Sequence, residues 1–490
     1  MMAYRAPDRK KPHAPIAEKM AAYAADGALA FHTPGHKQGK GAHEALRKLI
    51  TAEGLREEVS LMEELDDIHS PSGCIKEAEE LAARLYGAKA AYFMVNGTSG
   101  AIHTMLLAAL SPGDTVLVQR NAHRSVYSAL VLLGARPIYL APEVDERLGI
   151  AHGVALATIV CAIQRHPEAK AAVLVNPTYY GITTELDEIA EYLHNKGRLL
   201  LVDEAHGPHL AFCDRLPQDA IAAGADMAAQ STHKILGAMT QGSLLLANGD
   251  HVDYARIRET TGILTTTSPN QLLLASIDIA RLQMEESGRE AIERTAALAE
   301  KLRQDINKIP GLWSPGKDDF SRAGAVGLDL TKVTVNLAGL TITAIEAEEI
   351  LRHSYKVQCE LSDPENLLFI LSYADSEKET AVLLAALKDL AQKYLGKEKK
   401  PCTAAMPPLP KTKMTPREAF FAERESVSVK EAAGRIAAEE ITCYPPGIPA
   451  LVPGDVVTEE VLRYLERMRK LGRRTIGAQD ADFEKIVVVK

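Results

Sequence analysis

The sequence predicts an α/β protein built on a large, mostly parallel sheet with helices on both faces. From about residue 88 to residue 248, short β-branched and apolar runs alternate with longer amphipathic stretches. The apolar runs show no polar alternation, which is typical of strands that are covered on both faces. The chain has 490 residues, enough for about three domains with large cores. We therefore expect one large α/β domain followed by smaller units.

The elements of this sheet are expected in chain order. Strands are predicted at residues 90–95, 115–119, 137–140, 171–175, 198–205, 227–231 and 243–247. Amphipathic helices are predicted between some of them, at residues 98–110, 123–134 and 185–197. Such alternation is typical of α/β sheets with flanking helices.

The second half of the chain predicts smaller units. Residues 269–309 have a helical pattern with few breakers, which predicts long helices that leave the first domain. Residues 310–396 mix helical and strand-like runs, among them KVQCEL at 356–361. The expected division is an N-terminal segment at 1–30, a major domain at 31–290, a small α+β domain at 291–396, a charged and Pro-rich linker at 397–413, and a C-terminal domain at 414–490 with the Pro-rich segment 444–455 between two helical stretches.

Composition and charge exclude several classes of protein. The 56 basic and 65 acidic residues give a net charge of −9, and no long basic stripe occurs, so nucleic acid is not the expected partner. The six cysteines are scattered without a CxxC pair, which is typical of a reduced, cytoplasmic protein. No apolar run is long enough to span a bilayer, and no apolar segment follows the basic N-terminus. We expect a soluble, cytoplasmic protein with no membrane partner.

A first candidate site lies between a predicted strand and a predicted helix, in Asn96-Gly97-Thr98-Ser99-Gly100. Free backbone amides at a helix N-terminus, together with the hydroxyls of Thr98 and Ser99, form a site for an anion. The alternative is a simple helix cap, because Ser and Thr are common N-cap residues. The chain has neither GxGxxG nor GxxxxGK[ST], so the dinucleotide and P-loop interpretations lack their usual motifs.

A second candidate is Asp203, at the carboxyl end of a predicted strand. Ligands of open α/β sheets bind outside this end of the strands. A metal site formed by Asp203, His206 and His209 is one alternative, and a helix-capping acid is another.

A third candidate is Ser231-Thr232-His233-Lys234, which follows another predicted strand. Lys234 can be an ordinary surface lysine, or an amine whose pKa is lowered so that it forms an imine with a carbonyl cofactor. An anion site, an acid on a neighbouring strand and such a lysine together match the needs of pyridoxal phosphate. That cofactor requires a phosphate cradle, a carboxylate against its pyridinium nitrogen and a Schiff-base lysine.

The sequence resembles the bacterial ornithine/lysine/arginine decarboxylases, which have the aspartate-aminotransferase fold of fold-type I pyridoxal-phosphate enzymes. The matching stretches are FHTPGHKQG (31–39), LDDIHSPSGCIKEAE (65–79), NGTSGA (96–101), RNAHRS (120–125), NPTYYG (176–181), VDEAHGPH (202–209), STHK (231–234), TTTSP (265–269) and YPPGIPALVPGD (444–455). The PGHK motif begins at Pro34, so the N-terminal wing domain of the larger members is not expected. The chain looks like the short type of biosynthetic arginine decarboxylases.

The resemblance implies a role for each site residue. Lys234 is the expected Schiff-base lysine, Asp203 the partner of the pyridine nitrogen, and either Lys234 or His233 the acid that protonates Cα. His123 is expected to stack on the cofactor ring, while His206, where larger lysine-type members have Trp, has an open role. The residues expected at the phosphate are Gly97, Thr98, Ser99, Ser231 and His233, with Thr266 reaching the phosphate of a neighbouring subunit.

The resemblance also implies the substrate and the partners. Arginine, lysine and ornithine each carry a distant cation, for which Glu360 is the candidate acid, and arginine is the favoured substrate. A homodimer or a larger assembly of dimers is expected, with no metal. The alternatives are a lysine or ornithine decarboxylase, another fold-type I enzyme such as an aminotransferase, and an inactive regulatory paralogue.

Overall fold

The computed structural model describes residues 11–60, 62–396, 406–444, 447–470, 474–480 and 482–490. Residues 1–10 of the predicted N-terminal segment, residues 397–405 of the predicted linker and residues 445–446 of the YPPGIP motif lie outside this description. Within it, no helix is both long and apolar enough to cross a membrane.

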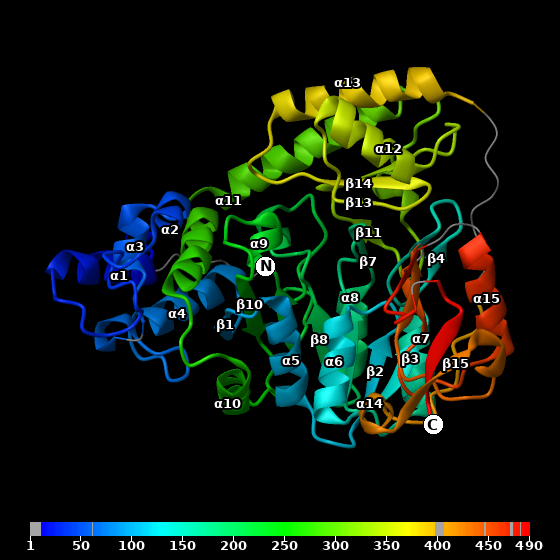
Figure 1. Cartoon of the computed structure of the whole chain (residues 1–490), viewed down its shortest axis with the longest axis horizontal. Helices are drawn as coiled ribbons and strands as arrows, with labels where there is room; N and C mark the ends of the chain where they lie inside the picture. Colours follow the sequence, from blue (N-terminus) through cyan, green and yellow to red (C-terminus); the bar gives the residue numbers. More distant parts are fainter. Residues whose placement is uncertain (1–10, 61, 397–405, 445–446, 471–473, 481) are drawn as a thin grey trace.

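The centre of the molecule is a sheet of seven strands (Figure 1). Its strands, in spatial order, are β1 (Ala90–Met94), β10 (Ser243–Ala247), β9 (Met227–Gln230), β8 (Leu199–Asp203), β6 (Ala171–Val175), β2 (Thr115–Gln119) and β3 (Arg136–Leu140). Neighbouring strands from β9 to β3 pair in parallel, while β10 runs antiparallel to both of its neighbours. The predicted mostly parallel α/β sheet is confirmed.

Two apolar cores cover the two faces of this sheet. Val202 and Leu174 belong to one core, while their chain neighbours Leu201 and Val173 belong to the other. Because consecutive side chains of a strand point to opposite faces, both faces need apolar residues, which explains the unbroken apolar runs. The covering helices include α4 (Cys74–Tyr86), α5 (Gly97–Ala109), α6 (Arg124–Leu133), α7 (Leu156–Arg165), α8 (Leu186–His194) and α10 (Tyr254–Leu264), and α1 (Pro15–Asp26), α2 (Glu44–Leu49) and α3 (Ala52–Glu57) precede them.

A single long helix, α11 (Gln271–Ile306), leads out of the sheet domain to a smaller α+β layer. This layer has an antiparallel sheet with its own apolar core beneath the two helices α12 (Ala344–Ile350) and α13 (Glu377–Tyr394), at the top of Figure 1. Its strands are β12 (Lys332–Asn336), β14 (Asn366–Ile370) and β13 (Leu361–Ser362).

The strand predicted at residues 356–361 is wrong over most of its length. Helix α12 continues into a π-helical turn at Leu351–Tyr355, and Lys356 adopts a φ of +58° that redirects the chain. Pairing with β14 begins only at Leu361, because only there does the chain run beside that strand.

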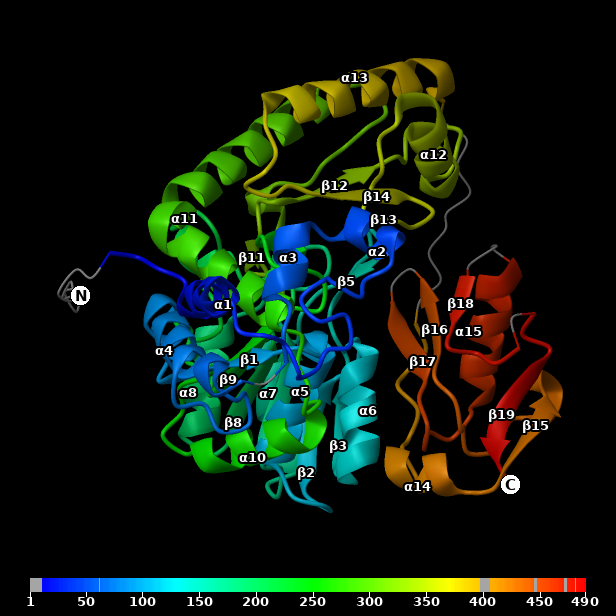
Figure 2. The same cartoon turned by 60° about the vertical axis from the view of Figure 1, so that its left-hand side comes forward.

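The C-terminal part forms a separate small layer that lies beside α6 (Figure 2). Its elements are α14 (Pro416–Phe421), β15 (Arg424–Ser428), β16 (Ile441–Tyr444), β17 (Ile448–Leu451), α15 (Glu459–Lys470), β18 (Arg474–Ile476) and β19 (Lys485–Val489). The Pro-rich segment contributes to a hairpin, β16 and β17, which local sequence did not reveal. The residue bounds proposed for the domains stay a prediction.

Candidate active site

A cavity of about 610 Å³ lies at the carboxyl ends of the parallel strands, between the sheet domain and the C-terminal layer. This is the edge where α/β sheets bind ligands. The cavity brings together nine of the residues that the sequence predicted for the site: Gly97, Thr98, Ser99, His123, Asp203, His206, Ser231, His233 and Lys234.

One end of the cavity is built to receive an anion. Helix α5 begins at Gly97, whose φ of +64° favours glycine, and the N-cap residue Asn96 makes no side-chain bond to the first amides. The Thr98 hydroxyl lies within hydrogen-bonding distance of the hydroxyls of Ser231 and Ser243. The Gly97 amide donates to the Gln241 carbonyl at 2.9 Å, so the amides of Thr98 and Ser99 are the ones that meet these hydroxyls at the positive end of a 13-residue helix.

Asp203 ends strand β8 on the cavity wall and is buried. The Ala205 amide donates to its carboxylate at 3.2 Å. Burial raises the pKa of Asp203, and the positive charges that His123 and Lys234 can carry act in the opposite direction. A carboxylate in this position can hold a proton on a basic ring nitrogen.

Lys234 lies on the short helix α9 (Thr232–Ile235), and its Nζ is 2.9 Å from Nε2 of His206. The enclosing protein lowers the pKa of Lys234, against the attraction of Asp203 and Glu360. Burial also lowers the pKa of His206 well below its usual range, so this ring is neutral. The lysine amine therefore sits beside a neutral acceptor, which suits a nucleophilic amine.

His206 is held by an aromatic neighbour that the sequence analysis did not single out. Its ring packs against the ring of Tyr179, with a centroid distance of 4.5 Å. Its Nδ1 is buried and has no hydrogen-bond partner among the described residues. An orphaned polar atom on a cavity wall indicates a missing ligand group or water.

The residues present fit pyridoxal phosphate. The anion cradle, the carboxylate of Asp203 and the amine of Lys234 are the three groups that the cofactor requires, and His123 presents its exposed ring to the same cavity. The alternative metal cluster does not form, because Nε2 of His209 lies 3.1 Å from Asp329 Oδ1. The described part of the chain contains no group of three or more His, Cys, Asp or Glu side chains placed to hold a metal ion.

Two predicted site residues are not on the cavity wall. Thr266 is exposed in the segment between α10 and α11, where its hydroxyl accepts a hydrogen bond from the Ser268 amide at 3.1 Å. Glu360 is also exposed, but the Tyr179 hydroxyl, which does line the cavity, donates to its carboxylate.

Sequence reasoning did not assign many of the wall residues to the site, among them Tyr179 and Glu440. Tyr179 belongs to the quoted NPTYYG motif, which was a usable signal. Glu440 comes from the C-terminal layer, and nothing local marked it, because only the docking of that layer brings it to the cavity.

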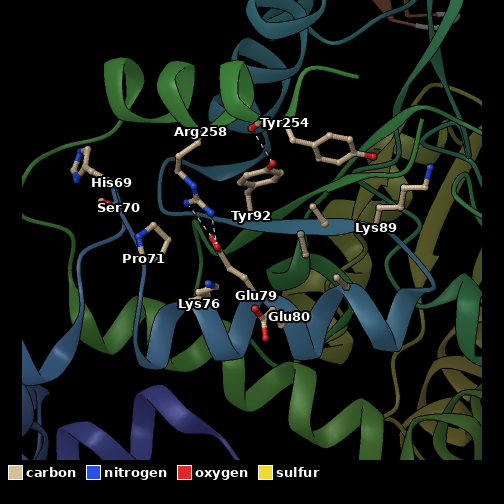
Figure 3. Close-up of a pocket in the computed structure, with 13 residues that line it drawn as sticks. His69, Ser70, Pro71, Lys76, Glu79, Glu80, Lys89, Tyr92, Tyr254 and Arg258 are labelled. Atoms are coloured by element: carbon tan, nitrogen blue, oxygen red, sulfur yellow. Dashed lines mark hydrogen bonds and ion pairs between the residues drawn. The ribbon is translucent and has the colours of Figure 1, made fainter. Parts of the chain in front are cut away.

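A second cavity, of about 370 Å³, lies between α4, α10 and β1 (Figure 3). Arg258 forms an ion pair with the buried Glu79 there, and its guanidinium lies 4.7 Å from the centre of the Tyr92 ring. None of the predicted site residues lines this cavity. The Arg258–Glu79 ion pair joins α10 to α4, which is a structural arrangement.

Comparisons with known proteins identify relatives of this chain over nearly its full length. The family model for the Orn/Lys/Arg decarboxylase major domain matches residues 14–317, and the model for the C-terminal domain matches residues 399–480. The chain is 41% identical over 478 residues to an arginine decarboxylase of Halalkalibacterium halodurans, covering 97% of both chains. It is 40% identical to an arginine decarboxylase of Bacillus subtilis, covering 94% of both.

A solved structure shows the same fold. The constitutive lysine decarboxylase of E. coli superposes with a TM-score of 0.85 at 24% identity, over 98% of this chain and 82% of that one. The matches to the family models and to the curated relatives extend over nearly the whole chain. The chain belongs to the Orn/Lys/Arg decarboxylase family.

Proposed function

We propose that the protein decarboxylates a basic amino acid with pyridoxal phosphate, and that its substrate is L-arginine, giving agmatine and CO₂. The observation that carries this proposal is the meeting of Lys234, Asp203 and the start of α5 on one cavity wall. Two curated relatives that match this chain over nearly their full length are arginine decarboxylases, which supports arginine as the substrate. Lysine and ornithine are the alternative substrates.

When bound, pyridoxal phosphate supplies a sink for the electrons that remain on Cα as CO₂ departs. The residues at the start of α5, with Ser231 and His233, would hold the phosphate. Asp203 would keep a proton on the pyridine nitrogen, and His123 would pack against the ring. Lys234 would hold the cofactor through its side-chain amine.

A proton must then reach Cα, and Lys234 and His233 are the two candidates. His233 Nδ1 lies 2.8 Å from the carbonyl oxygen of Gly242, so this nitrogen is committed to the backbone. Lys234 has its amine beside the neutral His206. We therefore favour Lys234 as the acid, with His206 orienting it.

An amine-product assay with arginine, lysine and ornithine tests the proposal. Agmatine and CO₂ should form from arginine, Lys234→Ala should abolish turnover and the borohydride-reducible link to the chain, and Asp203→Ala should remove most turnover. A Lys234→Ala variant with near-parent decarboxylation would contradict the assignment. Amino transfer to an added 2-oxo acid would indicate an aminotransferase instead, and a colourless protein that binds no cofactor would indicate an inactive paralogue.

We also propose a homodimer, or a larger assembly of dimers, in which Thr266 reaches the phosphate in the neighbouring subunit. Large apolar side chains are exposed just before this loop and in the N-terminal part of the chain: Ile263 is 79%, Phe31 91% and Leu49 83% exposed. Exposed apolar groups of this size favour a protein interface.

The free cysteines support a reducing, cytoplasmic location. The product, agmatine, would enter polyamine biosynthesis.

The proposed role of Glu360 is to bind the distal cation of the substrate. Its carboxylate is not on the cavity wall, but it accepts a hydrogen bond from Tyr179, which is. Glu360 would act at the edge of the cavity, with Tyr179 between it and His206.

A further inference from the structure

The C-terminal layer places a carboxylate directly on the wall of the active-site cavity. Glu440 immediately precedes β16, and the other residues of this layer on the wall are Thr442, Gly447, Pro449 and Ile476. The sheet domain supplies the groups proposed for the cofactor, so the wall opposite them comes from a different part of the chain.

The backbone that carries Glu440 is held firmly. Thr442 pairs with Pro449 of β17 and with Ile476 of β18, on the two sides of β16. A Cβ at Gly477 would lie 2.3 Å from the Glu440 carbonyl oxygen, so the chain after β18 passes directly against this residue. Glu440 is therefore enclosed by strands on both sides.

The hairpin is in turn anchored to the sheet domain by Arg120. The Arg120 guanidinium is fully buried, donates through Nε to the Pro449 carbonyl at 2.9 Å, and pairs with Asp455 at 2.6 Å. Because Arg120 directly follows β2, this contact ties the wall residues of the C-terminal layer to the central sheet. The Glu440 carboxylate thus has a defined position relative to the sheet edge.

The charge of Glu440 is only partly compensated. Its carboxylate accepts one hydrogen bond, from the Thr442 hydroxyl at 3.2 Å, and no ion pair within 4 Å joins it to another described residue. The positive groups that face it are Arg124, on the same wall, and Arg120, which is already paired with Asp455. A half-buried carboxylate without an ion-pair partner is costly, so the wall can accept one more cation.

We propose that Glu440 is a specificity-determining residue that binds the distal cation of the substrate, a guanidinium or alkylammonium group. This inference rests on the proposed decarboxylation of a basic amino acid. Glu440 would share this cation with Glu360, but the two acids differ in position: Glu440 lies on the cavity wall itself, while Glu360 is joined to the wall only through the hydrogen bond from Tyr179. A planar guanidinium can form two parallel hydrogen bonds to a carboxylate, which favours arginine in such a site.

The test compares steady-state kinetics of the holoenzyme with those of matched variants. Glu440→Gln removes the charge and keeps the shape, and should raise the KM for arginine by about tenfold or more with a much smaller change in kcat. Glu440→Asp should recover part of the affinity. Citrulline, the neutral isostere of arginine, should show the same kcat/KM with the parent and with Glu440→Gln.

Glu459→Gln is the matched control, because it makes the same charge change on an exposed residue of the same layer. It should leave the KM unchanged. An unchanged KM for arginine in Glu440→Gln, or an equal rise in Glu459→Gln, would overturn the role of Glu440. If Glu440→Gln does not fold, Glu440→Asp carries the test: its shorter side chain should leave the KM for arginine above the parent value, and a parent-like KM in that variant overturns the proposal.

Failure of the proposed function would look different. In that case the parent forms no amine from arginine, lysine or ornithine. Calorimetric binding of these amino acids to the parent and to Glu440→Gln still reports on the wall carboxylate, because binding needs no turnover. Equal Kd values would then overturn the inference about Glu440 independently.

Discussion

At the scale of single residues, His152 couples the fold to pH. Its ring is fully buried and packs edge-on against Phe320, and neither ring nitrogen has a hydrogen-bond partner among the described residues. Burial lowers the pKa of His152 to about 4, although Asp145, with Oδ2 at 3.7 Å from Nε2, acts in the opposite direction. The histidine is therefore neutral in the folded protein near pH 7.

The lowered pKa of His152 predicts how the free energy of unfolding changes with pH. Between about pH 6.5 and pH 4 the unfolded histidine binds a proton and the folded one does not, so the folded state loses stability as the pH falls. His152→Phe keeps a ring of similar shape and removes the titration. Relative to the parent, the variant should gain about 2.5 kcal/mol of unfolding free energy between pH 7.5 and pH 4.5. Urea unfolding at both pH values measures this difference, and parallel pH profiles for the two proteins would contradict it.

At the scale of elements, the start of α4 depends on a residue well outside the helix. Asp66 accepts hydrogen bonds from the amides of Gly73, Ile75 and Lys76 through Oδ2, at 2.8, 3.0 and 3.3 Å. The N-cap residue itself is Gly73 and offers no side chain. Asp66, seven residues before Gly73, therefore supplies the acceptor that an N-cap side chain usually provides. Its own φ of +66° is a backbone conformation that residues other than glycine rarely adopt.

Two substitutions distinguish the contribution of the Asp66 carboxylate to stability from the cost of the strained backbone at this residue. Asp66→Gly relieves the positive φ and removes every acceptor, so we expect a loss of about 3 kcal/mol in unfolding free energy. Asp66→Asn keeps one acceptor oxygen and should lose clearly less. Urea unfolding curves measure which of the two variants loses more unfolding free energy. Equal losses would show that the carboxylate is not what holds the start of α4.

At the scale of the whole molecule, the exposed position of Thr266 leads us to predict that each active site of a dimer contains residues of both subunits. If this loop completes the site of a second subunit, a Lys234→Ala chain mixed with a chain altered at Thr266 and Thr267 should regain activity. One of the two sites in each hybrid dimer then has both an intact lysine and an intact loop. The measurement is agmatine formation before and after subunit exchange, with each parent variant alone as the control. No recovery after demonstrated exchange would indicate a site contained within one chain.

Much of the central fold was predictable from local pattern. All seven strands of the large sheet lie where unbroken apolar runs predicted them, because a strand buried on both faces must be apolar at consecutive positions. The strand expected at 356–361 failed because a short alternation of polar and apolar residues does not show where the chain finds a pairing partner. The hairpin of β16 and β17 was missed because proline usually argues against strand pairing.

The sequence by itself determined the fold class and the group of Lys234, Asp203 and the start of α5, because parallel strands bring their carboxyl ends to one edge. Only the tertiary structure decided that Glu440 lies on that wall and that Glu360 lies behind Tyr179. Both acids lie far along the chain. The position of Glu440 depends on contacts such as the Arg120–Asp455 pair, between residues that are 335 positions apart, and Glu360 meets Tyr179 across 181 positions. The pattern of buried positions in a strand or helix is set by residues that are close in the sequence, so it can be predicted from that sequence. The docking of one layer on another depends on the packed shapes of both layers.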